Sequence, residues 1–158
     1  MATSLNPTEL EDLLDQRDIV DTLYRFGAGQ DLHDEALLAS AFADDAELDF
    51  AQPAARLGVA LPVMVGKAAI VPAIVAATSQ LDTTHTVSNP RVQRHGHDEA
   101  ELFALVEAQH LPQGDHVRHL LLKNIYRCRL RRTSQGWRIT RMHIHNVWLT
   151  GDPNVLFA

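Results

Sequence analysis

The sequence predicts a single α+β domain, in which N-terminal helices pack on one face of an antiparallel sheet. Helical patterns fill the first half of the chain, and the hydrophobic period changes to two from Thr83 onward. Helices followed by a run of strands are typical of an α+β domain with its helices on one face of the sheet. The length favours one domain over 1–158, with a core of about 7–149 and a C-terminal tail over 150–158.

The first helix is expected to begin at Pro7, with Asn6 as its cap, because asparagine accepts from orphan backbone donors and proline suits the first helical position. Its apolar face continues to Tyr24, and Gly27 and Gly29 are expected to loosen the helix near its end. A second, short helix over 36–42 follows, with Asp34 as a plausible cap.

The middle of the chain predicts one strand, one loop and one helix. Residues 46–50 alternate as a short strand, and 51–66 show no clean period, so we expect a long loop that acts as a lid. Residues 67–80 are alanine-rich and helical, with Pro72 near the first turn or at a kink.

Four longer strands are expected in the second half, separated by turn-forming residues. Their ranges are 87–93, 100–109, 116–132 and 137–148.

Composition excludes several classes of protein. The net charge is −6 and the longest basic run is Arg131-Arg132, whereas nucleic-acid binding needs a basic stripe. The acidic N-terminus does not fit a signal peptide, and the longest apolar stretch, 57–78, is interrupted by two prolines and a lysine. Cys128 is the only cysteine, so no internal disulfide can form. We expect a cytoplasmic protein that binds neither nucleic acid nor membrane.

Asp31, after the first helix, and His85, on the first long strand, are the candidate catalytic residues. Each has an ordinary alternative role, as a helix cap and as a packed or exposed strand side chain. If they meet, the carboxylate would fix the imidazole tautomer, which is the geometry of a proton-abstracting pair.

Several segments resemble the SnoaL-like proteins of the nuclear transport factor 2-like superfamily. They are Ile19 to Phe26, Asp31, Ala36 to Asp49, Thr84 to Asn89, and Gly136 to Ile139. The resemblance runs from about Leu13 to Trp148. It implies a cone-shaped α+β barrel with a deep pocket.

Within that superfamily the pattern resembles the scytalone dehydratase, bile-acid dehydratase and dehydrochlorinase group. The resemblance implies an Asp31–His85 pair that works without metal or organic cofactor, hence a lyase or isomerase, with a dehydratase favoured. Gln30 and Phe50 stand where scytalone dehydratase has tyrosines, and Met142 stands where the dehydrochlorinase has a pocket arginine.

The other candidate site residues follow from strand parity and from the resemblance. Asn124 shares a face with Leu120 and Leu122, which the resemblance places inward. His110 matches a pocket histidine of scytalone dehydratase, or else is a surface residue at a strand end beside Pro112. We expect Tyr24 to reach the cavity as a donor, or else to be a core tyrosine. By analogy with the family, Met142 and Asn146 also face the pocket. The expected apolar lining is Leu23, Phe50, Leu120, Leu122 and Trp148, and it favours an aromatic, polyketide-like or steroid-like substrate.

His143 and His145 would point to the same side of a strand, which suits a metal. They share parity with Trp137 and Ile139, opposite to Met142, so we expect them on the outer face and expect no metal site.

The uncovered face of the sheet predicts self-association. Its expected members are Val117, His119, Leu121, Lys123, Ile125, Arg141, His143, His145 and Val147. Related enzymes are commonly trimers, so a trimer is expected ahead of a dimer. The alternative to an enzyme is a non-catalytic ligand-binding or assembly subunit of the same fold, in which Asp31 and His85 form a structural hydrogen bond.

Overall fold

The computed structural model describes residues 6–157, so both ends of the predicted 1–158 domain, residues 1–5 and 158, lie outside it. The first helix, α1 (Pro7–Asp31), begins where the sequence predicts. The side chain of Asn6 accepts from the Glu9 amide at 2.9 Å, and the Glu9 carboxylate accepts from the Asn6 amide at 2.9 Å. This reciprocal capping satisfies two backbone donors at the helix start.

Helix α1 continues through Gly27 and Gly29 to Asp31, so the expectation that these glycines loosen its end is wrong. Close packing explains both glycines. A Cβ at Gly29 would lie 2.5 Å from the backbone nitrogen of Leu38, in helix α2 (Glu35–Ser40). The short helix α2 is capped by Asp34, as predicted.

The segment expected to be a loop over 51–66 contains a short helix, α3 (Ala51–Arg56), and a short strand, β2 (Met64–Val65). The preceding strand, β1 (Phe42–Asp49), starts four residues earlier than predicted. Helix α4 (Lys67–Thr78) includes Pro72 in its second turn.

The four long strands are confirmed, three of them with wider bounds, whereas the third begins four residues later than predicted. They are β3 (Leu81–His95), β4 (Glu99–Pro112), β5 (Leu120–Thr133) and β6 (Gly136–Gly151), and the chain ends in α5 (Asn154–Phe157). Strand β5 begins at Leu120, so Val117 and His119 lie in the preceding turn and not on the sheet face where they were expected.

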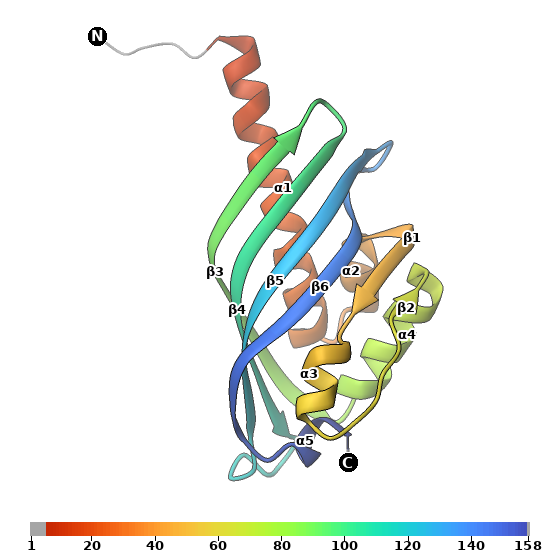
Figure 1. Ribbon diagram of the computed structural model, residues 1–158, viewed down its shortest axis with the longest axis vertical. Coiled ribbons are helices and arrows are strands. Elements are labelled where there is room, and N and C mark those ends of the chain that lie inside the picture. Colours follow the sequence, from red (N-terminus) through yellow and green to blue (C-terminus); the bar gives the residue numbers. More distant parts are fainter. Residues whose placement is uncertain (1–5, 158) are drawn as a thin grey trace, which may run out of the picture.

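The six strands form one sheet in the order β2-β1-β6-β5-β4-β3. The predicted antiparallel arrangement holds for β3 to β6, but β1 pairs with β6 in parallel. About ninety residues separate these two strands in the sequence, so no hairpin turn imposes an antiparallel direction on them. Figure 1 shows the sheet curling, with α1 and α2 behind it, α4 beside β1 and β2, and α3 and α5 near its lower end.

A bulge in β6 decides which of its side chains face inward. The register of β5 and β6 shifts between Arg129 and Leu130, where Thr140 is the extra residue. Trp137 and Ile139 before the bulge are therefore buried on the same face as Met142 after it. The prediction that Trp137 and Ile139 share a face with His143 and His145 is wrong for this reason.

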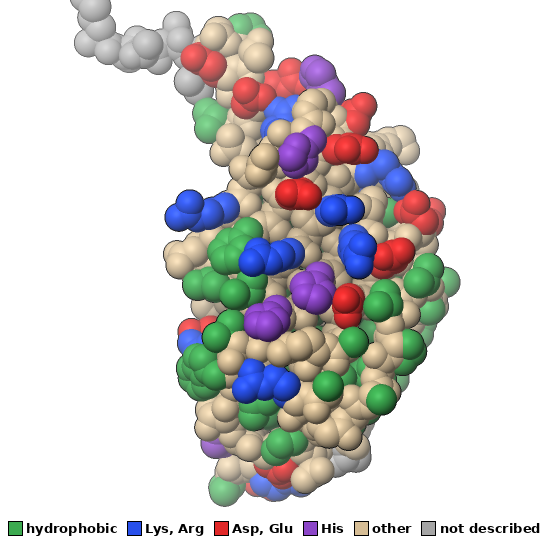
Figure 2. Space-filling model, in the orientation of Figure 1, with side chains coloured by type: hydrophobic (Ala, Val, Ile, Leu, Met, Phe, Trp, Pro, Cys, Tyr) green, Lys and Arg blue, Asp and Glu red, His purple; other side chains and the backbone are tan. Residues whose placement is uncertain are grey.

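The inner face of the sheet packs against α1, α2 and α4 in the main hydrophobic core. A smaller cluster, with Leu57, Leu120, Leu122 and Val155, fills the end of the sheet near α5. Figure 2 shows the outer face, where basic and histidine side chains gather beside hydrophobic ones. Among residues 6–157, no helix combines the length and the apolar character that a membrane span requires.

Candidate active site

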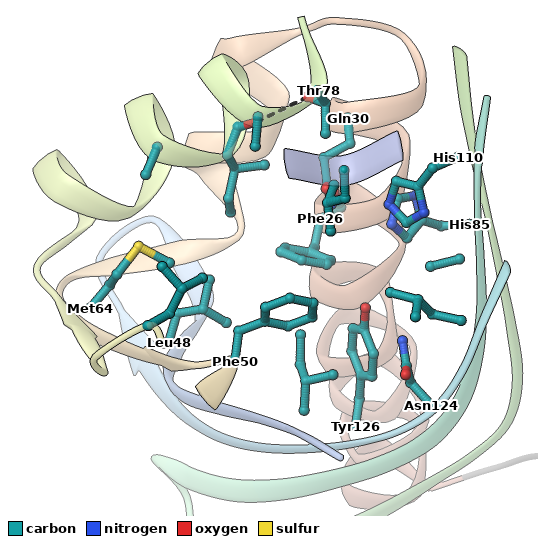
Figure 3. Close-up of a pocket in the computed structure, with 18 of the residues that line it drawn as sticks. Phe26, Gln30, Leu48, Phe50, Met64, Thr78, His85, His110, Asn124 and Tyr126 are labelled. Atoms are coloured by element: carbon teal, nitrogen blue, oxygen red, sulfur yellow. Dashed lines mark hydrogen bonds between the residues drawn. The ribbon is translucent and has the colours of Figure 1, made fainter. Parts of the chain in front are cut away.

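A cavity of about 230 Å³ lies between the inner face of the sheet and the helices. Polar side chains come from three adjacent strands: His85 from β3, His110 from β4, and Asn124 and Tyr126 from β5. The opposite side of the cavity is apolar. Figure 3 shows Leu48, Phe50 and Met64 across the cavity from these four polar side chains. A largely apolar pocket with a few convergent polar groups is the usual form of a small-molecule site.

The side chains of Asp31 and His85 meet at the edge of this cavity. His85 Nδ1 lies 2.6 Å from Asp31 Oδ1, and the His85 amide donates to Asp31 Oδ2 at 2.8 Å. The Thr83 hydroxyl, two residues earlier on β3, donates to Asp31 Oδ1 at 2.9 Å. Three donors from β3 therefore orient the carboxylate at the end of α1.

This geometry assigns the tautomer of the imidazole. Burial alone would raise the pKa of Asp31, but the hydrogen bonds from His85 and Thr83 outweigh it and hold that pKa below its ordinary value of 3.8. An ionised Asp31 accepts the Nδ1 proton of His85, so Nε2 carries the free lone pair of the neutral ring. The His85 side chain is only 3% exposed and lines the cavity.

Gly27 allows β3 to approach α1 closely enough for this contact. A Cβ at Gly27 would lie 2.9 Å from the Cβ of His85 and 3.6 Å from its Cγ. Gly27→Ala is therefore expected to push His85 away from Asp31, although alanine favours the helix by about 1 kcal/mol over glycine. In NMR spectra of the wild type, the His85 Nδ1 proton should give a downfield resonance, which the variant should lose or shift upfield. An unchanged resonance in a folded variant would contradict the close-approach argument.

His110 lies behind His85, with ring centroids 6.0 Å apart and the rings nearly perpendicular. Burial lowers the pKa of His110 from 6.5 to about 4, and the neighbouring His85 acts in the same direction. His110 is therefore neutral at physiological pH. Its Nδ1 lies 3.4 Å from the carbonyl oxygen of Leu120.

The structure places Asn124 on the cavity wall with its amide held from behind. Asn146 Nδ2 donates to Asn124 Oδ1 at 2.9 Å and to the Trp148 carbonyl at 2.9 Å. The Asn124 oxygen is thereby occupied, whereas its buried Nδ2 has no partner within the described residues. Asn146 was expected in the pocket, but it lies behind Asn124 and does not line the cavity.

Phe50 and Leu122 line the cavity together with His110, but other residues expected there do not. Tyr24 is 48% exposed and Trp148 is 47% exposed, so both expectations are wrong. The reason for Tyr24 is its helical position, because Leu23 and Phe26 occupy the buried side of α1. The register of β5 and β6 shifts again between Lys123 and Asn124. Trp148 follows this shift on β6 and therefore points outward. Leu23, Leu120 and Met142 are buried in the core without reaching the cavity.

Sequence reasoning missed Tyr126 and Thr78 as lining residues, whereas Gln30, which stands where scytalone dehydratase has a tyrosine, does line the cavity. A signal for Tyr126 was present, because it lies two residues after Asn124 and therefore on the same face of β5. Gln30 donates to the Phe26 carbonyl of its own helix at 3.0 Å. The position of Thr78 depends on how α4 packs over the sheet.

His143 and His145 lie outside the cavity, on the outer face of the sheet. His143 Nδ1 lies 3.0 Å from Asp49 Oδ2, at a point where β1 and β6 pair. In the part of the chain that the structure describes, no three His, Cys, Asp or Glu side chains are grouped as metal ligands.

Residues 11–143 match the SnoaL-like domain family, so the chain belongs to this family. The fold is that of the nuclear transport factor 2-like proteins, which include a similar structure from Streptomyces avermitilis (TM-score 0.70, 14% identity, covering 85% of this chain and 98% of that one). No curated protein matches the sequence.

Three further solved structures are similar over nearly the whole chain. The Kfla4162 protein from Kribbella flavida has a TM-score of 0.81 and 21% identity, and covers 93% of this chain and 99% of its own. A candidate scytalone dehydratase from Novosphingobium aromaticivorans has a TM-score of 0.76 and 18% identity, with 89% of each chain covered. A hexachlorocyclohexane dehydrochlorinase, LinA type 2, has a TM-score of 0.75 and 19% identity, covering 90% and 91%. At these identities the likeness establishes the fold and not the reaction.

Proposed function

We propose that this protein is a cofactor-independent lyase or isomerase in which His85 is the general base and Asp31 orients it. The observation that carries the proposal is the hydrogen bond between His85 Nδ1 and Asp31, which leaves the Nε2 lone pair of a cavity-lining histidine free to accept a proton. A positioned general base of this kind is typically worth about 10²–10⁴-fold in rate.

The chemistry begins with removal of a proton from carbon beside a carbonyl. His85 Nε2 takes the proton, the C–H electron pair forms the new C=C bond, and the carbonyl π pair moves to oxygen as an enolate. In a β-hydroxy substrate the carbonyl then re-forms, the enolate C=C pair becomes the double bond between the α and β carbons, and the bond between the β carbon and its hydroxyl oxygen breaks. The proton on His85 passes to the departing hydroxide, which leaves as water. In an isomerase the same proton would return to a different carbon.

Dehydration is favoured over isomerisation by the named relatives, since a dehydratase and a dehydrochlorinase both carry out eliminations. The size of the site narrows the substrate class further. Ligand pockets commonly measure about 300–1,000 Å³, and this cavity is smaller, at about 230 Å³. This volume favours a molecule of one or two rings over a full steroid skeleton. The apolar lining favours an aromatic or polyketide-like molecule.

The alternative is a non-catalytic ligand-binding or assembly subunit. A purely structural Asp31–His85 hydrogen bond needs no void beside it, so the cavity at His85 supports the catalytic proposal. The test is incubation with one- and two-ring β-hydroxy ketones in D₂O, followed by NMR. The expected result is exchange of the proton beside the carbonyl, with formation of the conjugated product. Ligands that bind against His85 without exchange would favour the alternative.

We also propose that the protein self-associates through the outer face of the sheet, with a trimer expected ahead of a dimer. Leu121, Ile125 and Val147 lie there beside His143 and His145, and this face is open to solvent in the described chain (Figure 2). Light scattering at micromolar concentration is expected to return a multiple of the chain mass. Ile125→Glu should reduce that mass, because it buries a charge in the interface. The control Val117→Glu, at a 90% exposed turn position, should leave it unchanged. A wild-type monomer would refute self-association.

A further inference from the structure

Tyr126 is a buried polar side chain for which the base-catalysed steps above provide no role. It is 3% exposed, and it lines the cavity from the centre of β5. Its ring packs edge-on against Phe26, with centroids 6.0 Å apart. Figure 3 shows its hydroxyl pointing into the cavity, on the side where His85 and Asn124 lie. Packing therefore holds the hydroxyl at a defined place.

Tyr126 is a donor at physiological pH. Burial raises the pKa of its phenol well above the usual 10, although the adjacent Asn124 amide acts in the opposite direction. The hydroxyl consequently keeps its proton and can donate it in a hydrogen bond, but cannot act as a base.

The Asn124 amide supplies the second donor at the same place. Its orientation is determined by Asn146, because exchanging the oxygen and nitrogen of Asn124 would bring two NH₂ groups together. Asn146 is itself held by Gln52, which accepts from its backbone amide at 2.7 Å, and by Arg56, which donates to its carbonyl at 2.9 Å. Among the described residues, the buried NH₂ group of Asn124 is thus left without a hydrogen-bond partner.

We propose that Tyr126 is a further catalytic residue, whose hydroxyl and the Asn124 NH₂ group together bind the substrate oxygen on which negative charge develops. The inference rests on the proposed function and deepens it. No proton is transferred at this oxygen. Fixed donors in a site that excludes water stabilise such charge more than water does, because they need no reorganisation as the charge forms.

This pair of donors also defines the substrate class. An oxygen that only accepts, such as that of a ketone or of its enolate, satisfies both donors at once. A hydroxyl group can also accept, but its own proton then needs an acceptor, and it develops no negative charge. The substrate therefore presents a ketone oxygen to β5, while the carbon that loses its proton lies next to His85.

Nitrophenols test this site without knowledge of the natural substrate. They fit a site for one aromatic ring, and their visible absorbance distinguishes bound phenolate from bound phenol. The wild type is expected to bind the phenolate form preferentially. Tyr126→Phe should weaken phenolate binding by roughly 10–100-fold, as is usual for loss of a hydrogen bond to a charged group. The control Tyr24→Phe makes the same chemical change at an exposed position and should leave binding unchanged.

Three outcomes would overturn the proposal. One is equal phenolate affinity in the wild type and in folded Tyr126→Phe, with folding checked by circular dichroism. Another is preferential binding of the neutral phenol by the wild type. This result would reject the donor site even if the variant does not fold. The third is a phenolate preference that disappears in His85→Gln and persists in Tyr126→Phe, because this would indicate ion pairing with protonated His85.

Failure of the donor site and failure of the proposed function are distinguishable. Phenolate binding that depends on Tyr126, in a protein that exchanges no proton with any ketone, would retain the donor site and reject the lyase or isomerase. Proton exchange at the wild-type rate in Tyr126→Phe would retain the lyase or isomerase and reject the donor site.

Discussion

Replacing His85 by alanine is expected to lower turnover by about 10²–10⁴-fold, because the variant lacks the group that accepts the proton from carbon. The ring lines the cavity, so its removal should enlarge the site and leave the sheet intact. The measurement is the rate of product formation from a β-hydroxy ketone, together with ligand affinity. Wild-type turnover in His85→Ala would reject the catalytic role and favour the non-catalytic subunit.

Asp31→Asn keeps the proposed base, His85, but changes the group that orients it. The asparagine oxygen can still accept from the His85 amide, but its NH₂ group would then face Nδ1 and stabilise the wrong tautomer. We expect kcat to fall strongly while substrate affinity changes little. Asp82→Asn is the matched control, since Asp82 lies on β3 beside Thr83 but is exposed and pairs with His116. An equal loss of activity in both variants would contradict a specific role for Asp31.

His110 is expected to make the free energy of unfolding depend on pH between about 6.5 and 4. Because its pKa in the folded protein is lowered to about 4, unfolded chains bind a proton in this range that folded chains do not. Stability should therefore fall as the pH falls from 6.5 to 4, and the contribution of His110 should level off below that. At about 1.4 kcal/mol per pH unit, the interval between the two pKa values corresponds to a loss of roughly 3 kcal/mol in the free energy of unfolding.

Urea unfolding at a series of pH values measures this effect. His110→Gln should show a shallower loss of stability between pH 6.5 and 4 than the wild type. His97→Gln removes a largely exposed histidine and should retain the wild-type dependence. The pKa of Asp31 is also lowered, so its stabilising contribution is lost only below its ordinary value of 3.8, outside this range. An identical pH dependence in His110→Gln and the wild type would contradict the buried neutral histidine.

Local patterns in the sequence predicted the class of the fold and much of its framework. The Asn6 and Asp34 caps mark helix starts, and the change of period near Thr83 marks the beginning of the sheet. Alternation along β5 correctly grouped Leu120, Leu122 and Asn124 on one face, which is buried. These features depend on neighbouring residues, through capping hydrogen bonds and the two-residue repeat of a strand, so they can be predicted without coordinates.

The resemblance to SnoaL-like proteins selected Asp31 and His85, but their contact depends on tertiary structure. The two residues are 54 positions apart, and they meet because Gly27 allows β3 to lie close against α1. The local helix propensity of this glycine predicts only that it loosens the helix, since propensity carries no information about the strand packed against it. A close approach between distant segments is a property of their packing alone.

By itself, the sequence determined the order of helices and strands, the residues of β5 that share a face and the residues available for chemistry. Only the tertiary structure decided which of them share a site. The β6 bulge brings Trp137 and Ile139 to the inner face, whereas Tyr24 and Trp148 turn to solvent and Tyr126 enters the cavity. The physical reason is that a cavity is bounded by side chains from several elements at once. Which side chains reach it depends on bulges, strand pairing and helix packing, which are set by contacts between residues far apart in the chain.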